Sequence, residues 1–444
     1  MRSLLDNPAV DSALIRLFRL RTRRFMQMDD TEGAVPAVPA GGCHLYIHIP
    51  FCPVLCPFCS FHRVQHKADA ARRYFAALRE EIRLYHAAGH TFSGAYFGGG
   101  TPTCEPAELV ETIDLIRGLF GVSEISVETN PLDLRPEILE PLRAAGVTRL
   151  SVGVQSFDDR LLREMGRLER CGGGRETAAR IRAAAGIFPT FNVDLIFNQA
   201  HQTVAGFESD LETFLSLGAN QVSCYPLMTS PGVRAQMAGA MGLPDRTRLR
   251  RFYRAMLRKL QPEFSASSAW CFTRSGHGND EYIVSNENYV GVGSGAFSYL
   301  DGTLYATTFN LGAYERRIAA GLTGITATRR LGTTDRMRYT LLVRMFGLGL
   351  DREWVRKHHG RKFLLRVWPE LFTLRVLGAA TRDEKGWRLT ERGMFWLMLM
   401  MSQFFESVNA CRETMRLRAE REQESPCENC AGVPARAFGA AGQV

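Results

Sequence analysis

Between residues 44 and 227, short apolar segments alternate with helical segments, and this alternation constrains the fold more than any other feature. Six apolar runs are expected to be strands: LYIHI, GAYFGGG, ISVETN, TRLSVGVQSF, FNVDLIF and NQVSCYPL. Helices are expected between them, over residues 70–88, 107–119, 136–145, 175–185 and 204–217. Strands that alternate with helices form a parallel sheet or barrel. We therefore predict a partial (β/α)6 barrel, an α/β fold whose chemistry lies at the carboxyl ends of the strands.

The rest of the chain divides around this barrel. Residues 1–40 form a basic amphipathic arm that ends in the linker AVPAVPAGG, and residues 41–300 contain the barrel. Residues 301–420 are expected to form a mostly α-helical, winged-helix-like domain with a small ribbon at residues 386–389. Residues 421–444 are polar and rich in glycine and alanine, so we expect a mobile tail.

Composition narrows the class of protein. The 444 residues are 45% hydrophobic and 23% charged, which suits a globular enzyme of more than one domain. The eleven cysteines are odd in number and unevenly spread, and no secretory signal is evident, so reduced thiols, metal ligation and a cytoplasmic location are expected. No run approaches the roughly 20 apolar residues of a membrane span. The net charge of +9 by itself favours no particular anionic partner.

Three cysteines form a C-x3-C-x2-C loop directly after the first strand. Cys52, Cys56 and Cys59 can hold three irons of a [4Fe-4S] cubane and leave the fourth iron open. An open iron is what S-adenosylmethionine (SAM) needs to bind through its amino and carboxylate groups and to be cleaved to a 5′-deoxyadenosyl radical. A zinc knuckle or an inert cysteine cluster is the alternative, and the neighbouring motifs make it less favoured.

Polar or glycine residues recur at the ends of the next strands. Residues 98–102 read GGGTP after the second strand, where glycines let a ligand approach the backbone closely. Glu128, Gln155 and Asp194 end the third, fourth and fifth strands. Each of them alone could be an ordinary strand-end cap. Their recurrence at one level of the barrel favours a binding site.

These segments resemble a known family. YIHIPFC with CPFC, FGGGTPT, ETNP, LSVGVQSFDDRLLREMGR and NVDLIF are similar to the oxygen-independent coproporphyrinogen III oxidase (HemN)-like group of radical SAM proteins, over residues 43–300. The resemblance implies two SAM molecules and an electron donor such as flavodoxin or ferredoxin. It assigns Tyr46, Gly99 and Glu128 to the SAM on the cluster. It assigns to the second SAM the residues Phe58, Gly100, Thr101, Gln155, Arg167 and Asp194.

Departures from the group's pattern bear on the product. Heme-chaperone relatives have LPGQT after the fifth strand, whereas this chain has NQAHQT at residues 198–203. The oxidase has a Gly-Cys pair after the cluster motif, whereas Ser60 and Phe61 follow it here. Both departures weaken the case for a heme chaperone and for porphyrinogen decarboxylation. The group also includes anaerobic heme-degrading enzymes and class C methyltransferases, which use the second SAM as methyl donor.

Two features outside the barrel suggest a lipophilic substrate. The basic arm, and the apolar segment 394–405 followed by Arg412, Arg416 and Arg418, suit peripheral contact with an anionic membrane surface. The alternative for the arm is a helix packed on the barrel with its arginines solvated, and for the apolar segment burial in the second domain is expected ahead of membrane contact. Within the group, menaquinone C8-methyltransferases combine a second SAM with a membrane-resident substrate, so we predict methylation of the naphthoquinone ring. A porphyrin or heme is the alternative substrate. No nucleic-acid partner is expected, because no RNA-binding appendage is evident.

The residue that restores aromaticity after methylation is not identified by the sequence. Cys224 and Tyr225, near the sixth strand, are weak catalytic candidates, and His201 and His277 are others. Ordinary packing or surface placement is the alternative for each of them. Cys427 and Cys430 form a C-x2-C pair, which needs further ligands, such as Cys411 or Cys43, to bind metal and otherwise consists of free thiols.

Overall fold

A curved parallel sheet forms the centre of the molecule. The computed structural model describes residues 24–31, 33–274 and 286–424, together with the single residues Arg16, Phe18, Thr22 and Val284. Six strands lie side by side in chain order and run parallel, which confirms the predicted β/α core: β2 (Cys43–Ile49), β5 (Ala95–Gly99), β6 (Ile125–Thr129), β7 (Arg149–Gln155), β8 (Thr190–Phe197) and β9 (Gln221–Pro226).

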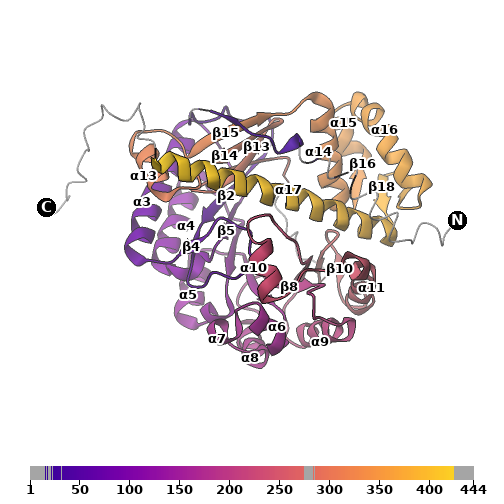
Figure 1. Cartoon of the computed structure of the whole chain (residues 1–444). Helices are drawn as coiled ribbons and strands as arrows, with labels where there is room; N and C mark the ends of the chain where they lie inside the picture. Colours follow the sequence, from indigo (N-terminus) through magenta and orange to yellow (C-terminus); the bar gives the residue numbers. More distant parts are fainter. Residues whose placement is uncertain are drawn as a thin grey trace.

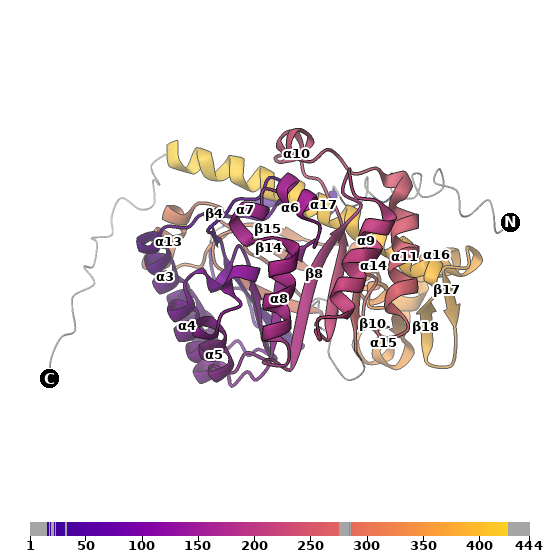
Figure 2. The same ribbon diagram turned by 90° about the horizontal axis from the view of Figure 1, so that it is seen from below.

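Helices cover the outer face of this sheet (Figures 1 and 2). The connections are α3 (Ala68–Ala87), α4 (Pro106–Phe120), α5 (Pro136–Ala144), α6 (Asp159–Glu164), α7 (Leu168–Cys171), α8 (Gly174–Ala184) and α9 (Val204–Leu215), and they are followed by α10 (Arg234–Ala240) and α11 (Leu249–Leu260). One face of the strands packs apolar side chains on these helices, whereas the alternate positions face the barrel interior and include polar residues such as Glu128 and Asp194. Ile47, Phe97 and Val127 are accordingly fully buried.

The sheet extends beyond the six strands at both edges. Next to β2 it continues through β12 (Asn288–Val292), which is parallel to β2, and then through β13 (Phe297–Leu300), β14 (Thr303–Thr307), β15 (Ile325–Arg330) and β1 (Asp29–Asp30). Next to β9 lie β11 (Cys271–Thr273) and β10 (Ser265–Ala266). The sequence predicts a boundary between the barrel and the C-terminal domain at residue 300. In the structure, that position falls in the tight β13–β14 hairpin, so the sheet reaches Arg330.

The C-terminal region packs three helices against a small sheet. Its elements are α14 (Thr333–Phe346), β16 (Gly349–Asp351), α15 (Arg352–His358), α16 (Arg361–Val376), β17 (Ala380–Arg382) and β18 (Gly386–Leu389). The strands form an antiparallel sheet in the order β16-β18-β17. This order of helices and strands resembles a winged helix. The ribbon expected at residues 386–389 is β18.

One long helix, α17 (Glu391–Glu424), connects this region back to the barrel. Figures 1 and 2 show it running across the molecule, past the end of the barrel where α6, α7 and α10 lie. Its apolar segment, in which Met398 and Met401 are fully buried, packs inside the protein. Packing, rather than membrane contact, therefore accounts for this segment. Among the described residues, no helix is both long and apolar enough to cross a membrane.

The described part of the N-terminal arm packs against the same helix. Phe25 lies against Tyr339 and Phe404, with ring centroids 5.6 Å and 5.9 Å away. Thr22 shares a 2.9 Å hydrogen bond with Ser407 of α17. Arg418 donates to Asp30 over 2.6 Å. Residues 1–15 and the tail from 425 on, with Cys427 and Cys430, lie outside the described residues.

Candidate functional site

The residues of the predicted site line one pocket at the carboxyl end of the barrel strands. It has a volume of about 420 Å³, and Cys52, Cys56 and Cys59 all line it. So do all the residues that the resemblance assigned to SAM: Tyr46, Phe58, Gly99, Gly100, Thr101, Glu128, Gln155, Arg167 and Asp194. These residues come from five strands and the loops that follow them, so the barrel brings them together.

The cysteine loop is held from within by Arg63. Its guanidinium donates to the Cys56 carbonyl over 2.5 Å and to the Cys59 carbonyl over 2.8 Å, which pins the turn between the last two thiols. Burial raises the pKa of the Cys52 thiol to about 12 and also raises that of Cys59. Because iron binds the thiolate, cluster assembly must displace these protons.

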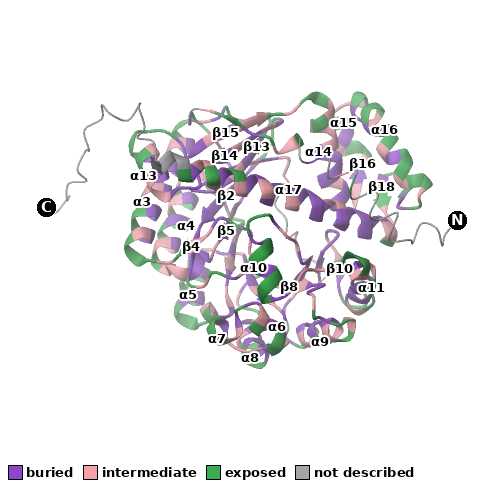
Figure 3. Cartoon of the chain, in the orientation of Figure 1, coloured by how far each residue is buried: buried purple, intermediate pink, exposed green. Residues whose placement is uncertain are grey.

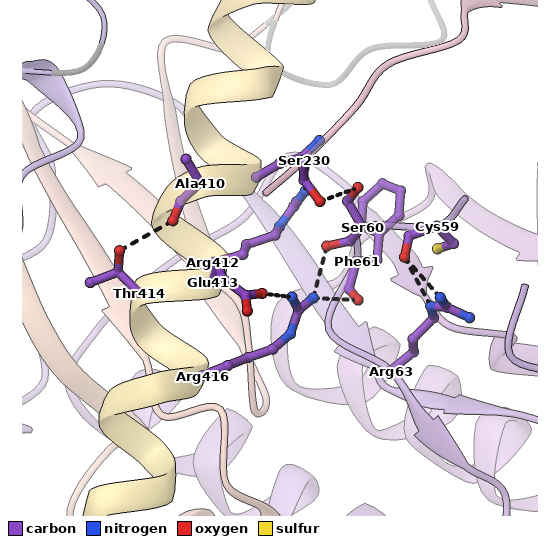
Figure 4. A network of polar contacts seen from close by, with 11 residues as sticks. Cys59, Ser60, Phe61, Arg63, Ser230, Ala410, Arg412, Glu413, Thr414 and Arg416 are labelled. Carbon is purple, nitrogen blue, oxygen red and sulfur yellow. Dashed lines mark hydrogen bonds and ion pairs between the residues drawn. The ribbon is translucent and has the colours of Figure 1, made fainter. Parts of the chain in front are cut away.

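Helix α17 holds the far end of this loop (Figure 4). Arg416 donates to the carbonyl oxygens of Ser60 and Phe61, each over 2.9 Å, and pairs with Glu413 over 2.7 Å. One turn earlier, the Arg412 guanidinium lies 4.5 Å from the centre of the Phe61 ring. The arginines that the sequence analysis considered for membrane contact are therefore engaged inside the protein.

The glycine run at the end of β5 brings the backbone close to the cysteine loop. Gly100 donates to the Ile49 carbonyl over 2.7 Å, and a Cβ atom there would lie 2.5 Å from the Phe51 carbonyl oxygen. Gly99 has a φ of 111°, which disfavours a side chain. A Cβ at Gly98 would lie 3.0 Å from the Glu128 carboxylate. Each glycine in the run is thus explained by a close approach or a backbone angle.

Glu128 is positioned by partners on the neighbouring strand β5, and Tyr46 by His48 on its own strand β2. The Glu128 carboxylate accepts from the Tyr96 hydroxyl over 2.8 Å and from the Gly99 N–H over 3.1 Å. His48 Nε2 lies 2.9 Å from the His62 carbonyl, and its Nδ1 lies 3.0 Å from the Tyr46 hydroxyl. A carbonyl only accepts, so Nε2 carries the proton and Tyr46 donates to Nδ1. Burial lowers the pKa of His48 to about 4, which keeps this ring neutral.

Thr101 and Arg167 form a polar link between the glycine run and the cysteine loop. The Thr101 hydroxyl donates to Cys52 Sγ over 3.7 Å and accepts from Asn130 over 2.7 Å. Arg167 donates to the Gly153 carbonyl over 2.5 Å and lies 3.6 Å from Cys56 Sγ. Both side chains therefore contact a predicted cluster ligand, in addition to facing the pocket. The sequence offered no signal for Asn130 as their shared partner.

The end of β7 is irregular where Gln155 enters the pocket. The β7–β8 register shifts between Gly153 and Gln155, and Gln155 has a φ of 75°, which is uncommon for a residue with a side chain. Asp194, on β8, accepts from Ser151 over 3.0 Å and from Asn192 over 2.8 Å. A strained backbone position directed into a pocket is typical of a functional residue.

A pair of substitutions at Gln155 separates backbone strain from ligand binding. We expect Gln155→Gly to be more stable than Gln155→Ala by about 1 kcal/mol, because glycine adopts positive φ without a Cβ clash. Both variants lose the side-chain amide, so both should bind the second SAM more weakly. Urea denaturation and equilibrium dialysis with labelled SAM measure the two effects. Equal stabilities would contradict the strain, and full binding by either variant would contradict the amide contact.

The weak catalytic candidates lie in different surroundings. Tyr225 lines the pocket and packs on Trp270, with 5.2 Å between the rings, whereas Cys224 is fully buried in the apolar core. His201 is exposed and lies 3.0 Å from Glu164. His277 is outside the described residues. Of these four, Tyr225 alone is placed by the structure at the pocket.

The turn after β8 lacks the proline-glycine pair of the heme-chaperone sequences, and Asn198 forms it instead. Asn198 begins the NQAHQT segment with a φ of 65°, a conformation that asparagine tolerates better than most residues. Its side-chain amide donates to the Asp245 carbonyl over 3.1 Å. The departure in sequence therefore preserves a sharp turn at this edge of the barrel.

A second group of pocket-lining residues, the aromatic wall, was not predicted. It is made mainly of apolar and aromatic side chains from the arm, β12–β14, α14 and α17: Met26, Met28, Tyr289, Phe297, Leu304, Tyr339, Phe404, Phe405 and Val408. These residues are far apart in the sequence and share no motif, so only the packing of α17 across the barrel brings them together. Arg412 and Asn409 add the polar groups of this wall, joined by a 2.7 Å hydrogen bond.

Soft thiolate ligands at a pocket of this kind fit an iron-sulfur cluster. Among the described residues, no three side chains are arranged around one point that a single metal ion would occupy. A cubane makes a different demand, because its three cysteines each bind a separate iron. The residues present therefore fit a [4Fe-4S] cluster, with Thr101 and Arg167 beside its ligands.

Comparisons with known proteins agree with the geometry. The family model for the radical SAM superfamily matches residues 46–211. The heme chaperone HemW of Bacillus subtilis is 32% identical over 289 residues, which cover 62% of this chain and 74% of that protein. Oxygen-independent coproporphyrinogen III oxidase of Escherichia coli is 34% identical over 213 residues, which cover 46% of this chain and only 45% of that protein.

A solved structure supports the fold over a larger part of the chain. Coproporphyrinogen III oxidase (HemN) from Escherichia coli matches with a TM-score of 0.69 at 24% identity, and the match covers 83% of this chain and 91% of that chain. Radical SAM proteins hold a [4Fe-4S] cluster and SAM, in agreement with the three-cysteine loop. The chain therefore belongs to the radical SAM superfamily and, within it, to the group that includes HemW and oxygen-independent coproporphyrinogen III oxidase.

Proposed function

We propose that this protein is a class C radical SAM methyltransferase that binds two SAM molecules and methylates an unactivated sp2 carbon, C8 of the naphthoquinone ring of menaquinone. The observation that supports this proposal is the mixed lining of the pocket. The same pocket contains the cysteines with the polar residues assigned to SAM and the apolar residues of the aromatic wall. A flat, uncharged ring suits that wall.

The cations of the pocket favour a neutral substrate over a porphyrinogen with four carboxylates. Among the described residues, four arginines line it: Arg63, Arg167, Arg170 and Arg412. Arg63 donates to the carbonyls of the cysteine loop, Arg167 to the Gly153 carbonyl and Arg412 to Asn409. A buried carboxylate without a cation is costly, and four guanidinium groups of which three already donate to protein groups do not match four carboxylates. A quinone carries no charge and needs only hydrogen-bond donors.

Residues of this chain perform the positioning that the reaction needs. When bound, the cluster and the first SAM supply a 5′-deoxyadenosyl radical, and the second SAM supplies the methyl carbon. Glu128 and Tyr46 hold the first SAM, and Asp194 with Arg167 orients the second. The aromatic wall excludes water and presents the ring. Tyr225, opposite Ile196 on the neighbouring strand, lines the pocket, and its hydroxyl would relay the ring proton onward; a flavodoxin or ferredoxin supplies the two electrons of the net reaction.

The second candidate is a heme-related activity, favoured by the 32% identity to HemW. The heme chaperone and the coproporphyrinogen oxidase both handle tetrapyrroles by name. Heme has two propionates, and Arg170 and Arg412 on the pocket wall match that number. Under this alternative the aromatic wall packs on the tetrapyrrole face, and the product is a modified or transferred heme.

One set of reactions distinguishes the two functions. The purified protein, reconstituted with its cluster and reduced by flavodoxin, is incubated with SAM that carries a carbon-13 methyl group. Menaquinone, heme and coproporphyrinogen are supplied in separate reactions, and the products are analysed by mass spectrometry. We expect menaquinone to gain one labelled methyl group on its ring. Unchanged menaquinone would refute the proposal, and consumption or tight binding of heme would establish the alternative.

A further inference from the structure

Helix α16 presents an apolar stripe to solvent. Four large apolar side chains, Leu365, Trp368, Phe372 and Val376, are 77%, 46%, 52% and 53% exposed. Their spacings of three, four and four residues place them on one face of the helix. In Figure 3, α16 lies at the periphery of the molecule and carries residues coloured as exposed. Isolated exposed apolar residues are ordinary, but a continuous row is not.

The stripe is not needed to hold α16 in place. Phe363, Val367 and Leu371, on the opposite face, are fully buried in the core. Within the stripe, Trp368 has partial contact with Trp387, at 6.3 Å between the rings, and with Phe372 at the same distance. The helix therefore has two apolar faces. The inner one packs against the core, and the outer one is exposed.

Cations flank the stripe. At 100° per residue, exposed Lys362 and Arg366 lie on one side of it, and exposed Arg375 lies on the other. The sequence of α16 contains one acidic residue, Glu370, and it pairs with Arg338 over 2.8 Å. The preceding helix α15 adds exposed Arg356 and Lys357. Apolar and aromatic residues bordered by Lys and Arg are the pattern of a helix that lies at a bilayer interface.

We infer that α16 docks this protein on an anionic lipid bilayer. The stripe enters the boundary between headgroups and acyl chains, while the flanking cations contact lipid phosphates. The stripe residues do not line the catalytic pocket, so this surface is distinct from the active site. The surface differs from the arm and the segment 394–405, for which the sequence left membrane contact open. The third helix of a winged helix often contacts DNA, but here the centre of the exposed face is a row of large apolar side chains, which suits acyl chains better than a phosphate backbone.

The test uses the full chain in vesicle co-sedimentation. Vesicles of phosphatidylcholine alone are compared with vesicles that also contain phosphatidylglycerol. Three variants are compared with the unmodified chain. The stripe variant combines Leu365→Ser and Phe372→Ser, and the cation variant combines Lys362→Gln, Arg366→Gln and Arg375→Gln. The control variant is Leu322→Ser. Leu322 is 41% exposed in a loop far from α16 in the sequence. Circular dichroism checks that each variant is folded.

We expect binding to anionic vesicles that falls about tenfold or more in each α16 variant and is unchanged by Leu322→Ser, since each cation near the surface contributes roughly fivefold. Binding of the unmodified chain to anionic vesicles should also weaken at high salt. Equal sedimentation of all variants would overturn the inference. Two other results would also overturn the inference. A dimer that becomes a monomer when Leu365 and Phe372 are replaced by serine would assign the stripe to contact with a second copy. DNA binding that is lost in the cation variant would assign the surface to DNA. These readouts do not depend on methyl transfer and are thus independent of the proposed function.

Discussion

Replacement of Asp194 by alanine is expected to abolish methyl transfer while SAM cleavage at the cluster stays measurable. The Asp194 carboxylate faces the pocket, and hydrogen bonds from Ser151 and Asn192 hold it in one orientation. Because the resemblance assigns this residue to the second SAM alone, its loss should leave the first SAM in place. A misplacement of about 1 Å between reacting groups costs roughly 10²-fold in rate.

Three measurements check this expectation. Equilibrium dialysis with labelled SAM should find two molecules per unmodified chain and one per Asp194→Ala chain. Formation of 5′-deoxyadenosine should continue in the variant, whereas S-adenosylhomocysteine should not appear. Ser223→Ala is the matched control, because Ser223 donates to Asn192 over 3.1 Å in the same network but does not line the pocket. Equal loss of both reactions, or two bound SAM molecules in the variant, would contradict the assignment.

Replacement of Gly100 by alanine is expected to reduce 5′-deoxyadenosine formation by about 10²-fold or more. The added methyl group would lie 2.5 Å from the Phe51 carbonyl and 2.8 Å from the Ile49 carbonyl, so backbone would have to move. Phe51 directly precedes the first cluster cysteine. A shift of about 1 Å in the glycine run therefore displaces both the SAM backbone contacts and the cysteine loop. Overpacking of this kind also destabilises a fold by about 1–3 kcal/mol.

The control for this prediction is Gly118→Ala. Gly118 lies within α4, and a Cβ there meets no heavy atom within 4 Å. Alanine should stabilise the helix at that position by roughly 0.5–1 kcal/mol and leave SAM cleavage unchanged. Iron content, thermal unfolding and 5′-deoxyadenosine yield are measured for both variants. A Gly100→Ala protein that forms 5′-deoxyadenosine at the unmodified rate would show that the close approach is not required.

The strand order and the SAM side of the pocket were predictable because they depend on local patterns. Alternating apolar runs identify parallel strands, and parallel strands bring their carboxyl ends to one edge. Residues as distant as Glu128 and Asp194, at the ends of the third and fifth strands, were therefore expected to meet, and they line one pocket. The resemblance then assigned a role to each position. Those roles, the second SAM and the methyl transfer stay predictions until the binding and product measurements above are made.

The substrate side was not predictable, because its residues converge only through long-range packing. Phe297 belongs to β13 and Phe404 to α17, and neither sits in a recognisable motif. The same holds for Arg416, whose contacts with Ser60 and Phe61 span more than 350 positions. From sequence, a basic residue after an apolar segment suggests membrane contact as readily as an internal hydrogen bond. Only the path of α17 across the barrel distinguishes the two.

The radical SAM core could be recognised from local sequence alone, through the β/α alternation, the three-cysteine loop and the glycine run. These are short segments whose chemistry depends on residues near one another in the chain. The tertiary structure alone decided which surfaces are apolar and where they point. It buried the segment 394–405, exposed the stripe of α16 and closed the pocket with an aromatic wall. Burial depends on what packs against a side chain from elsewhere in the chain, and periodicity in one segment does not contain that information.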